Sequence, residues 1–535
     1  MVANIADLFE HAADTFPDRL AVACGDREIT FGALEQRANR LAHHLAACGV
    51  GPGTHVGFYA RNSIQAMETL IATYKLRAVA ININYRYVDD EVLYVLTNAN
   101  VRALVHDRRY SDTVAAVAPK TPGLDTFVVI EDESDADFAS YGGVAFEAAI
   151  AGGHPGRDFA ARSPDDIYML YTGGTTGYPK GVMWRHEDVW RVLGGGIDFM
   201  TGIPVEDEWA QSKRGVEMGT GLVRLCLAPL IHGNAQWAGL AALFTGDTVV
   251  LVTRFDPAEI WETIQRRKVN VLVLIGDAMA RPLIETYAAG EYDASSLYAI
   301  SSSAALFSPS VKHQYITALP GLMLTDSIGS SETGFTGMGL VTDTDDSNGG
   351  PRVLPVSEIT VLGEDGLPAP VGVVGRLART GHLPLGYYQD PEKTAAMFTE
   401  VDGVRYALPG DLARREEDGT VTLLGRGNTC VNTGGEKVFP EEVEGALKSH
   451  PAVFDALVIG IPDDLLGQKV AALIQFREGH QAELTVLDAH LRTRIAGYKV
   501  PRAVWLVAEI SRTTSGKADY RWAHRHAQEN PRHTV

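Results

Sequence analysis

Four short apolar runs constrain the fold of this chain more than any other feature. They are "VGFYA" at 56–60, "AVAININ" at 78–84, "TVVLV" at 248–252 and "VNVLVLIG" at 269–276. They are largely apolar rather than alternating, which is typical of strands buried on both faces of a parallel sheet. Residues 31–48 instead place Leu34, Ala38, Leu41 and Leu45 at helical spacing. The chain is therefore expected to be an α/β protein built from layered sheets.

A second, smaller domain is expected near the C-terminal end. The 535 residues are enough for two or more domains. The composition changes near "GRGN" at 425–428, and about a hundred residues of strands and helices follow. We predict a large N-terminal domain at 1–427 and a smaller α+β domain at 428–535. Residues 202–220 read as a polar surface loop.

Charge and cysteine content exclude several classes of protein. The formal net charge of −20 argues against coating nucleic acid or an anionic membrane. The four cysteines are scattered without zinc spacing, which fits a reducing compartment. No signal peptide or membrane-spanning run is present, so a cytoplasmic protein is expected. His43 and His44 have no partner at ligand spacing and are expected at a solvent edge.

A glycine- and threonine-rich stretch, "YTGGTTGYPKGV" at 171–182, indicates a phosphate-binding loop. It is not the P-loop of kinases, because the glycine spacing is shorter and Pro179 removes an amide that such a loop needs. The stretch follows "DIYMLY" at 166–171, a strand-like run. Ligands of α/β sheets usually bind at such strand ends.

Several motifs in order resemble the adenylate-forming superfamily, which contains acyl-CoA synthetases, luciferases and peptide-synthetase adenylation domains. Beside the loop they are "SSAALF" at 302–307, "DSIGSSETG" at 326–334, "GDLA" at 410–413, "GRGNTCVNTGGEKVFPEEVE" at 425–444 and "SRTTSGKADYRW" at 511–522. The resemblance covers nearly the whole chain. It implies that a carboxylate attacks ATP to give an acyl-adenylate and pyrophosphate, and that the thiol of CoA then displaces AMP. Mg²⁺ is the implied cofactor, with ATP and CoA as co-substrates.

The resemblance also assigns roles to residues. The implied ATP-binding residues are Thr172, Gly174, Thr175, Thr176, Lys180, Ser302, Ser303, Ala304, Asp326, Ser327, Ser331, Asp411, Arg426 and Lys517. Within this set the loop and Lys180 are implied to hold the departing phosphates, and 302–305 to flank the adenine. Asp411 is implied to bind the ribose, and Arg426 the ribose or a phosphate. Glu332 is the implied ligand of Mg²⁺, a hard ion that prefers oxygen.

The small domain is implied to act in both steps of the reaction. Lys517 is its catalytic residue for adenylate formation, placing positive charge where negative charge develops in the transition state. The resemblance implies that this domain is mobile and swings about a hinge at Asn428, where the family usually has Asp or Lys. Gly434, Gly435 and Lys437 are then implied to bind CoA.

The acyl group is expected to be apolar. The segment "PLIHGNAQWAGLAAL" at 229–243 is mostly small and apolar, and it lacks the "FD" pair of relatives that activate amino acids. His232 is implied to be a catalytic or gating ring, with a buried structural role as the alternative. "GVMWRHEDVW" at 181–190 resembles bacterial fatty acyl-CoA synthetases, including those acting on steroid side-chain acids.

Three alternatives therefore stay open at the level of the sequence. The first is a ligase joining a medium- or long-chain, branched or steroid side-chain acid to CoA. The second is an adenylation enzyme that loads a carrier-protein thiol. The third is a non-catalytic nucleotide-binding protein. The expected partners are ATP, CoA and the acid, without nucleic acid, and the resemblance suggests a homodimer.

Overall fold

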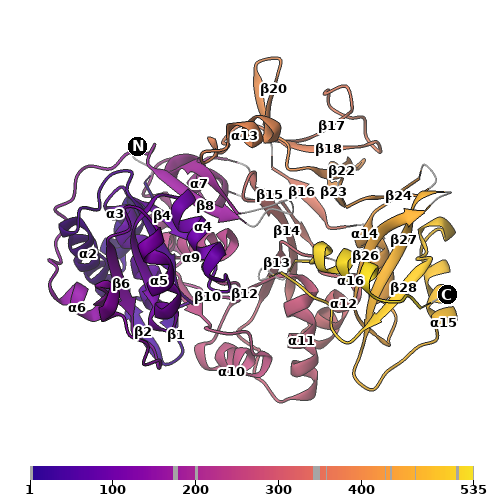
Figure 1. Ribbon diagram of the computed structural model, residues 1–535, viewed down its shortest axis with the longest axis horizontal. Helices are drawn as coiled ribbons and strands as arrows, with labels where there is room; N and C mark the ends of the chain where they lie inside the picture. Colours follow the sequence, from indigo (N-terminus) through magenta and orange to yellow (C-terminus); the bar gives the residue numbers. More distant parts are fainter. Residues whose placement is uncertain are drawn as a thin grey trace. The chain divides into compact units, whose positions relative to one another are not determined.

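A computed structural model describes residues 4–172, 179–198, 203–341, 350–356, 358–427, 429–433, 436–463, 466–513 and 517–533 (Figure 1). Its chain divides into two compact units. The first comprises Met1–Val273, Ser331–Phe335 and Gly381–Glu400, and the second comprises Leu274–Ser330, Thr336–Thr380 and Val401–Val535. Helices and parallel strands alternate in the first unit, so the predicted α/β class is confirmed. The predicted domain boundary at residue 428 stays a prediction.

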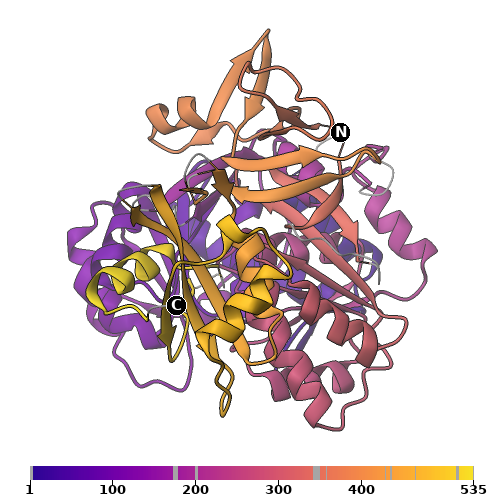
Figure 2. The same cartoon turned by 90° about the vertical axis from the view of Figure 1, so that its right-hand side faces the viewer.

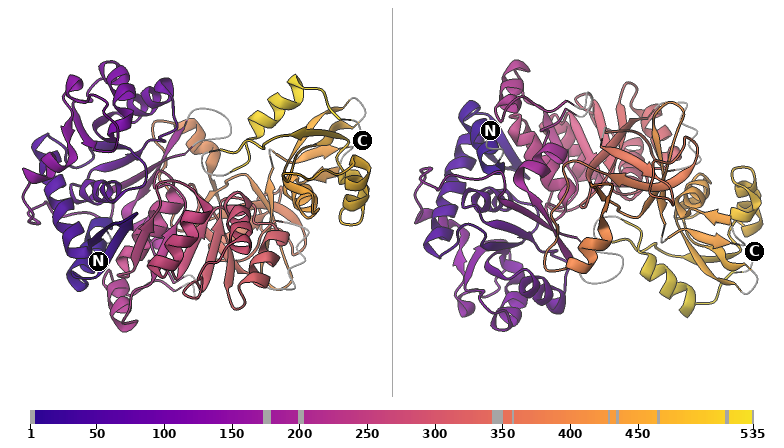
Figure 3. Two further views of the ribbon diagram at one scale, coloured as in Figure 1. Left: turned by 90° about the horizontal axis from the view of Figure 1, so that it is seen from below. Right: turned by 90° about the horizontal axis from the view of Figure 1, so that it is seen from above.

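The apolar runs at 56–60 and 78–84 form neighbouring strands of a parallel sheet, as predicted. The strands in spatial order are β4 (Val79–Asn82), β3 (His55–Tyr59), β5 (Val101–Asp107), β6 (Thr126–Ile130) and β7 (Val144–Ala145). Helices cover the sheet on both sides (Figure 3). They include α3 (Ile64–Lys75), α4 (Asp89–Asn98), α5 (Ser111–Val117) and α6 (Phe146–Ala151).

The apolar runs at 248–252 and 269–276 belong to a second sheet of this unit. Five neighbouring strands of this sheet are, in spatial order, β2 (Arg27–Thr30), β1 (Leu20–Cys24), β11 (Thr248–Leu251), β10 (Val223–Cys226) and β12 (Val271–Leu274). All neighbouring pairs except β1 with β2 are parallel. Beside these strands are α1 (Ile5–Thr15), α2 (Phe31–Ala47), α9 (Gly233–Phe244) and α10 (Pro257–Arg267).

The helix predicted at 31–48 is α2. Its apolar stripe of Leu34, Ala38, Leu41 and Leu45 is fully buried, as the spacing predicted. The helix starts where Thr30 caps it, because the hydroxyl of Thr30 accepts a hydrogen bond from the amide of Ala33.

The prediction of a loop at 202–220 is partly wrong, because the structure has helix α8 at Ala210–Glu217. Gln211 is buried, and its side chain accepts a hydrogen bond from Nε1 of Trp190 at 2.7 Å. Trp190 belongs to α7 (His186–Leu193). This contact between distant segments stabilises a helix that the polar sequence alone did not indicate.

The second unit contains parallel and antiparallel strands. The strands β13 (Ala299–Ser303) and β14 (Met323–Ser330) are parallel, with α11 (Gly276–Ala289) and α12 (Pro309–Ala318) nearby in the chain. The antiparallel strands are β15 (Gly334–Leu340), β16 (Arg352–Pro355), β17 (Ile359–Leu362), β18 (Val374–Arg379), β21 (Val404–Ala407), β22 (Asp411–Arg415) and β23 (Val421–Arg426).

The C-terminal segment forms a five-stranded sheet between helices (Figure 2). Its strands are β24 (Val431–Thr433), β25 (Glu436–Val438), β26 (Val453–Asp463), β27 (Gly467–Phe476) and β28 (Ala503–Val507). One face packs on α14 (Pro440–Lys448) and α15 (Leu484–Arg492), and the other packs on α16 (Tyr520–Glu529). Within the parts of the chain that the structure describes, no helix combines the length and apolar composition needed to cross a membrane.

Two buried histidines of the first unit make the stability of the fold depend on pH. His106 and His186 are fully buried, and burial lowers the pKa of each to about 4 from 6.5. Nδ1 of His186 accepts a hydrogen bond from the amide of Ile5, which fixes a neutral ring. Below pH 6.5 the unfolded chain takes up protons that the folded chain does not, so the folded state loses stability as the pH falls toward 4.

We therefore expect each histidine to remove about 2 kcal/mol of unfolding free energy between pH 7 and pH 5. Urea unfolding at both pH values should show that His186→Gln loses less stability on acidification than the unaltered protein does. An identical loss in the two proteins would contradict this role of His186.

Candidate active site

The ends of the predicted phosphate loop are held together by a hairpin. Strand β8 (Ile167–Thr172) precedes the loop and β9 (Lys180–Arg185) follows it, and Thr172 lies opposite Lys180 in the antiparallel register. The predicted residues Gly174, Thr175 and Thr176 lie outside the described residues. The structure thus brings Thr172 and Lys180 together at the point where the loop begins and ends.

A third strand brings Tyr387 to this hairpin. Strand β19 (Gly386–Tyr387) pairs with β9, so that Tyr387 lies opposite Val182. The ammonium of Lys180 lies 5.0 Å from the centre of the Tyr387 ring. The hydroxyl of Tyr387 donates a hydrogen bond of 2.9 Å to Oε1 of Glu332. One tyrosine therefore contacts both the predicted phosphate-binding lysine and the predicted magnesium ligand.

The turn that carries Glu332 is fixed from the same hairpin. Nε1 of Trp184, a buried residue of β9, donates a hydrogen bond of 2.9 Å to the carbonyl of Ser331. Gly334 has φ +64°, and a Cβ there would lie 2.6 Å from Cγ2 of Val192. Glycine is therefore required for this turn. The backbone beside Glu332 is held by Trp184 and its side chain by Tyr387.

The electrostatics around Lys180 suit an anionic ligand. Burial and the nearby positive charge of Lys393 lower the pKa of Lys180, while Asp390 and Glu332 act in the opposite direction. Lys393 and Asp390 form an ion pair of 2.8 Å beside it, at the start of α13 (Pro391–Met397). A phosphate bound here would supply counter-charge to both lysines. The cluster of Lys180, Glu332 and Tyr387 can therefore bind a phosphate and a hard cation together.

A buried asparagine that the motifs did not indicate connects this strand to the predicted acyl segment. Nδ2 of Asn82 donates to the carbonyls of Tyr171 at 2.8 Å and Ile231 at 2.7 Å, and its Oδ1 accepts from the amide of Tyr171 at 2.7 Å. Asn82 thus fixes the residue before Thr172 and the residue before His232. The available signal was a polar residue inside the apolar run 78–84.

Two further buried amides hold the segment that leads to His232. Oδ1 of Asn62 accepts a hydrogen bond from the amide of Leu230 at 2.7 Å. Nε2 of Gln236 donates a hydrogen bond to the carbonyl of Leu230 at 2.8 Å. The hydroxyl of Tyr168 in turn donates to Oε1 of Gln236 at 2.9 Å. His232 is half-buried at the N-terminal end of α9. The segment that carries His232 is therefore fixed from three elements.

Replacing Asn82 by alanine is expected to destabilise the first unit. The substitution leaves three buried backbone groups of Tyr171 and Ile231 without this partner, and each such loss costs about 1–3 kcal/mol. We expect the unfolding free energy to fall by about 3 kcal/mol or more, measured by urea unfolding. Asn84→Ala is the control, because Oδ1 of Asn84 accepts a hydrogen bond from the exposed amide of Arg86 rather than from a buried one. Equal midpoints for the two variants would contradict the role of Asn82.

The predicted adenine-binding residues lie on two paired strands of the second unit. Ser302 and Ser303 of β13 lie opposite Asp326 and Ser327 of β14. Oγ of Ser302 accepts from the amide of Gly276 at 3.0 Å, so this hydroxyl is used within the fold. Asp326 forms an ion pair with Lys312, which is also largely buried. Ala304 follows with φ +66°. These residues lie together at one end of the paired strands. The side chains of Ser302 and Asp326 also have partners within the fold, namely Gly276 and Lys312.

The predicted ribose-binding residues are opposite one another. Asp411 begins β22 and Arg426 ends β23, and the two are partners in the antiparallel register. Gly410, which precedes Asp411, has φ +86°, so the turn there needs glycine. The predicted hinge residue Asn428 lies outside the described residues.

Lys517 is exposed and follows residues 514–516, which lie outside the described residues. The amide of Thr513 donates to the carbonyl of Lys517 at 2.8 Å, and the amide of Lys517 donates to Oγ1 of Thr513 at 3.1 Å. Arg512, which precedes Thr513, forms a two-fold ion pair with Asp455 at 2.7 and 2.8 Å. Lys517 is therefore presented to solvent from a fixed base.

Of the predicted CoA-binding residues, the structure describes Lys437. Lys437 lies in the middle of β25, opposite Asn432 of β24. Gly434 and Gly435 lie outside the described residues. Lys437 is thus on a strand of the C-terminal sheet, whereas Lys517 lies between β28 and α16.

Comparisons with known proteins agree with this arrangement. The sequence profile described as AMP-binding enzyme matches residues 9–388, and that described as AMP-binding enzyme C-terminal domain matches residues 442–517. A 3-oxocholest-4-en-26-oate–CoA ligase of Rhodococcus rhodochrous is 56% identical, over 98% of this chain and 96% of the relative. A medium/long-chain-fatty-acid–CoA/3-oxocholest-4-en-26-oate–CoA ligase of Mycolicibacterium smegmatis is 52% identical, over 99% and 98%.

Solved structures share the fold. An anthranilate CoA ligase in complex with anthranoyl-AMP has a TM-score of 0.85 at 24% identity, over 99% of both chains. ATP-bound MatB of Rhodopseudomonas palustris has a TM-score of 0.83 at 24% identity, over 99% of both chains. The predicted architecture, a large N-terminal domain followed by a smaller C-terminal domain, is confirmed. The chain belongs to the AMP-binding enzyme family and is an AMP-forming acyl-CoA ligase that uses ATP and CoA.

Proposed function

We propose that this ligase activates a large apolar carboxylic acid, either a steroid side-chain acid or a medium- or long-chain fatty acid. The observation that carries the proposal is the identity of 52–56% to relatives named for these acids, over nearly the whole of each chain. The segment at 229–243 supports it, since small apolar residues around the buried Trp237 suit an apolar tail.

In the proposed first step, a carboxylate oxygen of the acid attacks the α-phosphorus of ATP. The bond from that phosphorus to the bridging oxygen breaks, and pyrophosphate leaves. Lys180 and Thr172 hold the departing phosphates, and Lys517 offsets negative charge on the α-phosphate in the transition state. In the second step the sulfur of CoA attacks the acyl carbon, the thiol proton is lost, and AMP leaves.

Mg²⁺ is part of the proposal. The carboxylate of Glu332 is the type of ligand that this ion prefers, and the adjacent Lys180 would contact the same phosphates. When bound, Mg²⁺ would neutralise charge on the phosphates. Tyr387 then acts as a positioning residue, since its hydroxyl orients the Glu332 carboxylate.

The Tyr387→Phe variant tests that positioning. It removes only the hydroxyl, and the ring beside Lys180 remains. We expect the Mg²⁺ concentration for half-maximal adenylate formation to rise about tenfold. This is the lower end of the range of losses in metal affinity seen when a residue that orients a metal ligand is removed. Tyr388→Phe is the matched control, because the hydroxyl of Tyr388 accepts a hydrogen bond from the side chain of Asn100 instead. Equal magnesium curves for both variants would remove Tyr387 from this role.

Three further parts of the proposal rest on the sequence and the family resemblance. The segment 428–535 turns about Asn428 between the two steps, presenting Lys517 first and the region of Lys437 second. Lys437 lies on β25 and Lys517 lies between β28 and α16, and these separate positions in the C-terminal segment support such an alternation. A cytoplasmic location and a homodimer complete the proposal.

A panel of acids tests the substrate class. CoA-dependent AMP release would be measured with acetate, benzoate, octanoate, palmitate and a steroid side-chain acid. We expect kcat/KM to be highest for the steroid acid or for the longer fatty acids. A maximum at acetate or benzoate would contradict the proposed substrate, and AMP release without any CoA stimulation would favour loading of a carrier-protein thiol.

A further inference from the structure

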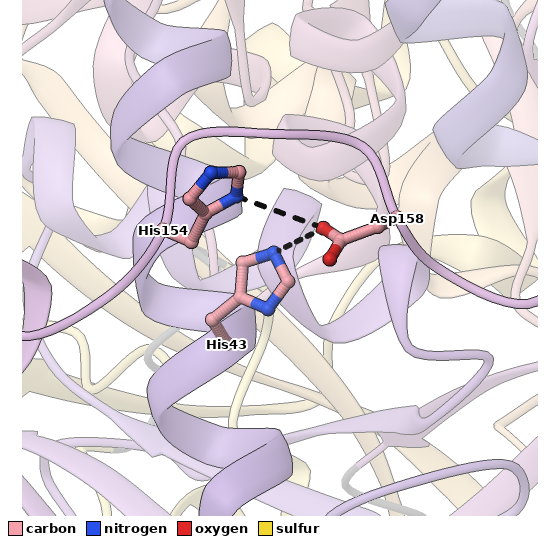
Figure 4. Close-up of side chains that lie close together, drawn as sticks. All are labelled: His43, His154 and Asp158. Atoms are coloured by element: carbon pink, nitrogen blue, oxygen red, sulfur yellow. Dashed lines mark ion pairs between the residues drawn. The ribbon is translucent and has the colours of Figure 1, made fainter.

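A second cluster of potential metal ligands lies in the first unit. His43 belongs to α2, whereas His154 and Asp158 belong to the segment that joins α6 to β8. Nε2 of His43 is 2.9 Å and Nδ1 of His154 is 3.8 Å from Oδ1 of Asp158. Both rings are directed toward the same carboxylate (Figure 4). His43 has no partner at ligand spacing in the sequence, but the fold brings two potential ligands beside it from a distant segment.

The segment with His154 and Asp158 is fixed on α2 by contacts around the cluster. Nδ2 of Asn39 donates to the carbonyl of Pro155 at 2.8 Å, and Nη1 of Arg40 donates to that of Gly153 at 2.9 Å. Arg157 forms an ion pair of 2.6 Å with Glu35. A Cβ on Gly153 would lie 2.1 Å from the carbonyl oxygen of Arg40, so only glycine fits this approach. The three candidate ligands are thus held close together before any ion binds.

The two rings have further partners that orient them. The ring of His43 stacks on Phe159 at 4.6 Å between centroids, and its Nε2 is 3.2 Å from the carbonyl oxygen of Gly156. Nδ1 of His154 accepts a hydrogen bond of 3.0 Å from the amide of Gly156. An ion would replace this bond and the contact of His43 with Asp158, because each nitrogen would direct its lone pair at the metal.

The ligand types select a class of ion. In the parts of the chain that the structure describes, this is the one group of three His, Cys, Asp or Glu side chains whose ligand atoms converge, all within 4.8 Å. Tetrahedral bonds of about 2.0–2.1 Å place neighbouring ligand atoms about 3.3 Å apart. His154 and Asp158 are 68% and 70% exposed, so modest side-chain rotations can reach that spacing. Two imidazoles and one carboxylate suit Zn²⁺ or Co²⁺ better than Mg²⁺ or Ca²⁺.

We propose that His43, His154 and Asp158 form a site for a transition-metal dication such as Zn²⁺, separate from the Mg²⁺ site proposed at Glu332. Three protein ligands leave a fourth position to water. The bound ion fastens the segment before β8 to α2, and β8 leads directly into the predicted phosphate loop. This inference does not depend on the proposed substrate or on Glu332.

Zinc titration of the full-length, tag-free and metal-stripped protein, without nucleotide, tests the site. Isothermal calorimetry should detect one Zn²⁺ per chain that Mg²⁺ does not displace. His43→Asn, His154→Asn and Asp158→Asn should each weaken zinc affinity about tenfold or more, at least the loss typical for removing a partner of a metal ligand. Because His154 and Asp158 are exposed, their variants should fold normally, and circular dichroism would verify the fold of all three.

The neighbouring His44→Asn serves as the control on the same helix and should bind zinc as the unaltered protein does. Co²⁺ gives a second readout, because a tetrahedral nitrogen and oxygen site produces a visible absorption band that the three ligand variants should lose. Absence of stoichiometric zinc binding would overturn the proposal. So would zinc binding that is the same in the unaltered protein and in the His43→Asn and Asp158→Asn variants.

Discussion

The Lys517→Ala variant is expected to form acyl-adenylate about 100-fold or more slowly than the unaltered enzyme. The substitution removes a positive charge that the proposed mechanism places at the α-phosphate, and losing one such stabilising contact typically costs 10²–10³ in rate. The side chain of Lys517 is exposed, so the fold should be preserved. Pyrophosphate release from ATP and the acid, measured before CoA is added, reports this step alone.

The second half-reaction distinguishes alternation of the C-terminal segment from a general defect. A supplied acyl-adenylate and CoA should give thioester in the Lys517→Ala variant at a rate within about twofold of the unaltered enzyme, because that step uses other residues. Arg525→Ala removes the same charge from an exposed position on α16 and should leave both steps unchanged. Equal loss of both steps in Lys517→Ala would contradict the alternation.

The Glu332→Gln variant is expected to raise the Mg²⁺ requirement for adenylate formation about tenfold or more. The amide oxygen can still accept the hydrogen bond from Tyr387, but the charge that would attract the ion is lost. Initial rates across a magnesium series measure the effect. Glu392→Gln is the control, since Glu392 is an exposed carboxylate on the nearby α13. An unchanged magnesium curve would remove Glu332 from the site.

A double variant tests whether Tyr387 acts through Glu332. If the hydroxyl of Tyr387 only orients the carboxylate, adding Tyr387→Phe to Glu332→Gln should change the Mg²⁺ requirement little further. Residues that contact one another commonly show such non-additivity. Two fully additive effects would instead mean that Tyr387 acts independently of Glu332.

The sequence predicted those parts of the fold that local pattern determines. The buried strands β3, β4, β11 and β12 were visible as apolar runs, and α2 was visible from its spacing. Helix α8 was not, because its sequence is polar and a distant tryptophan, Trp190, stabilises it. Contacts between segments far apart in the chain leave no local pattern to interpret.

The same limit applies to the candidate sites. Motifs indicated Lys180 and Glu332, each from its own neighbours in the sequence. Tyr387 carries no such signal, because it lies 55 residues from Glu332 and meets it only through the pairing of β19 with β9. His43 was interpreted as a solvent-edge residue for the same reason, since His154 and Asp158 reach it only in the folded chain.

The most direct test of the two-step account is exchange of labelled pyrophosphate into ATP with a steroid side-chain acid or palmitate, with CoA left out. Reversible adenylate formation predicts exchange that depends on the acid and Mg²⁺ but not on CoA. It also predicts that CoA, once added, converts the bound adenylate to thioester and AMP in equal amounts. Exchange that requires CoA, or release of ADP and phosphate in place of AMP and pyrophosphate, would contradict the account.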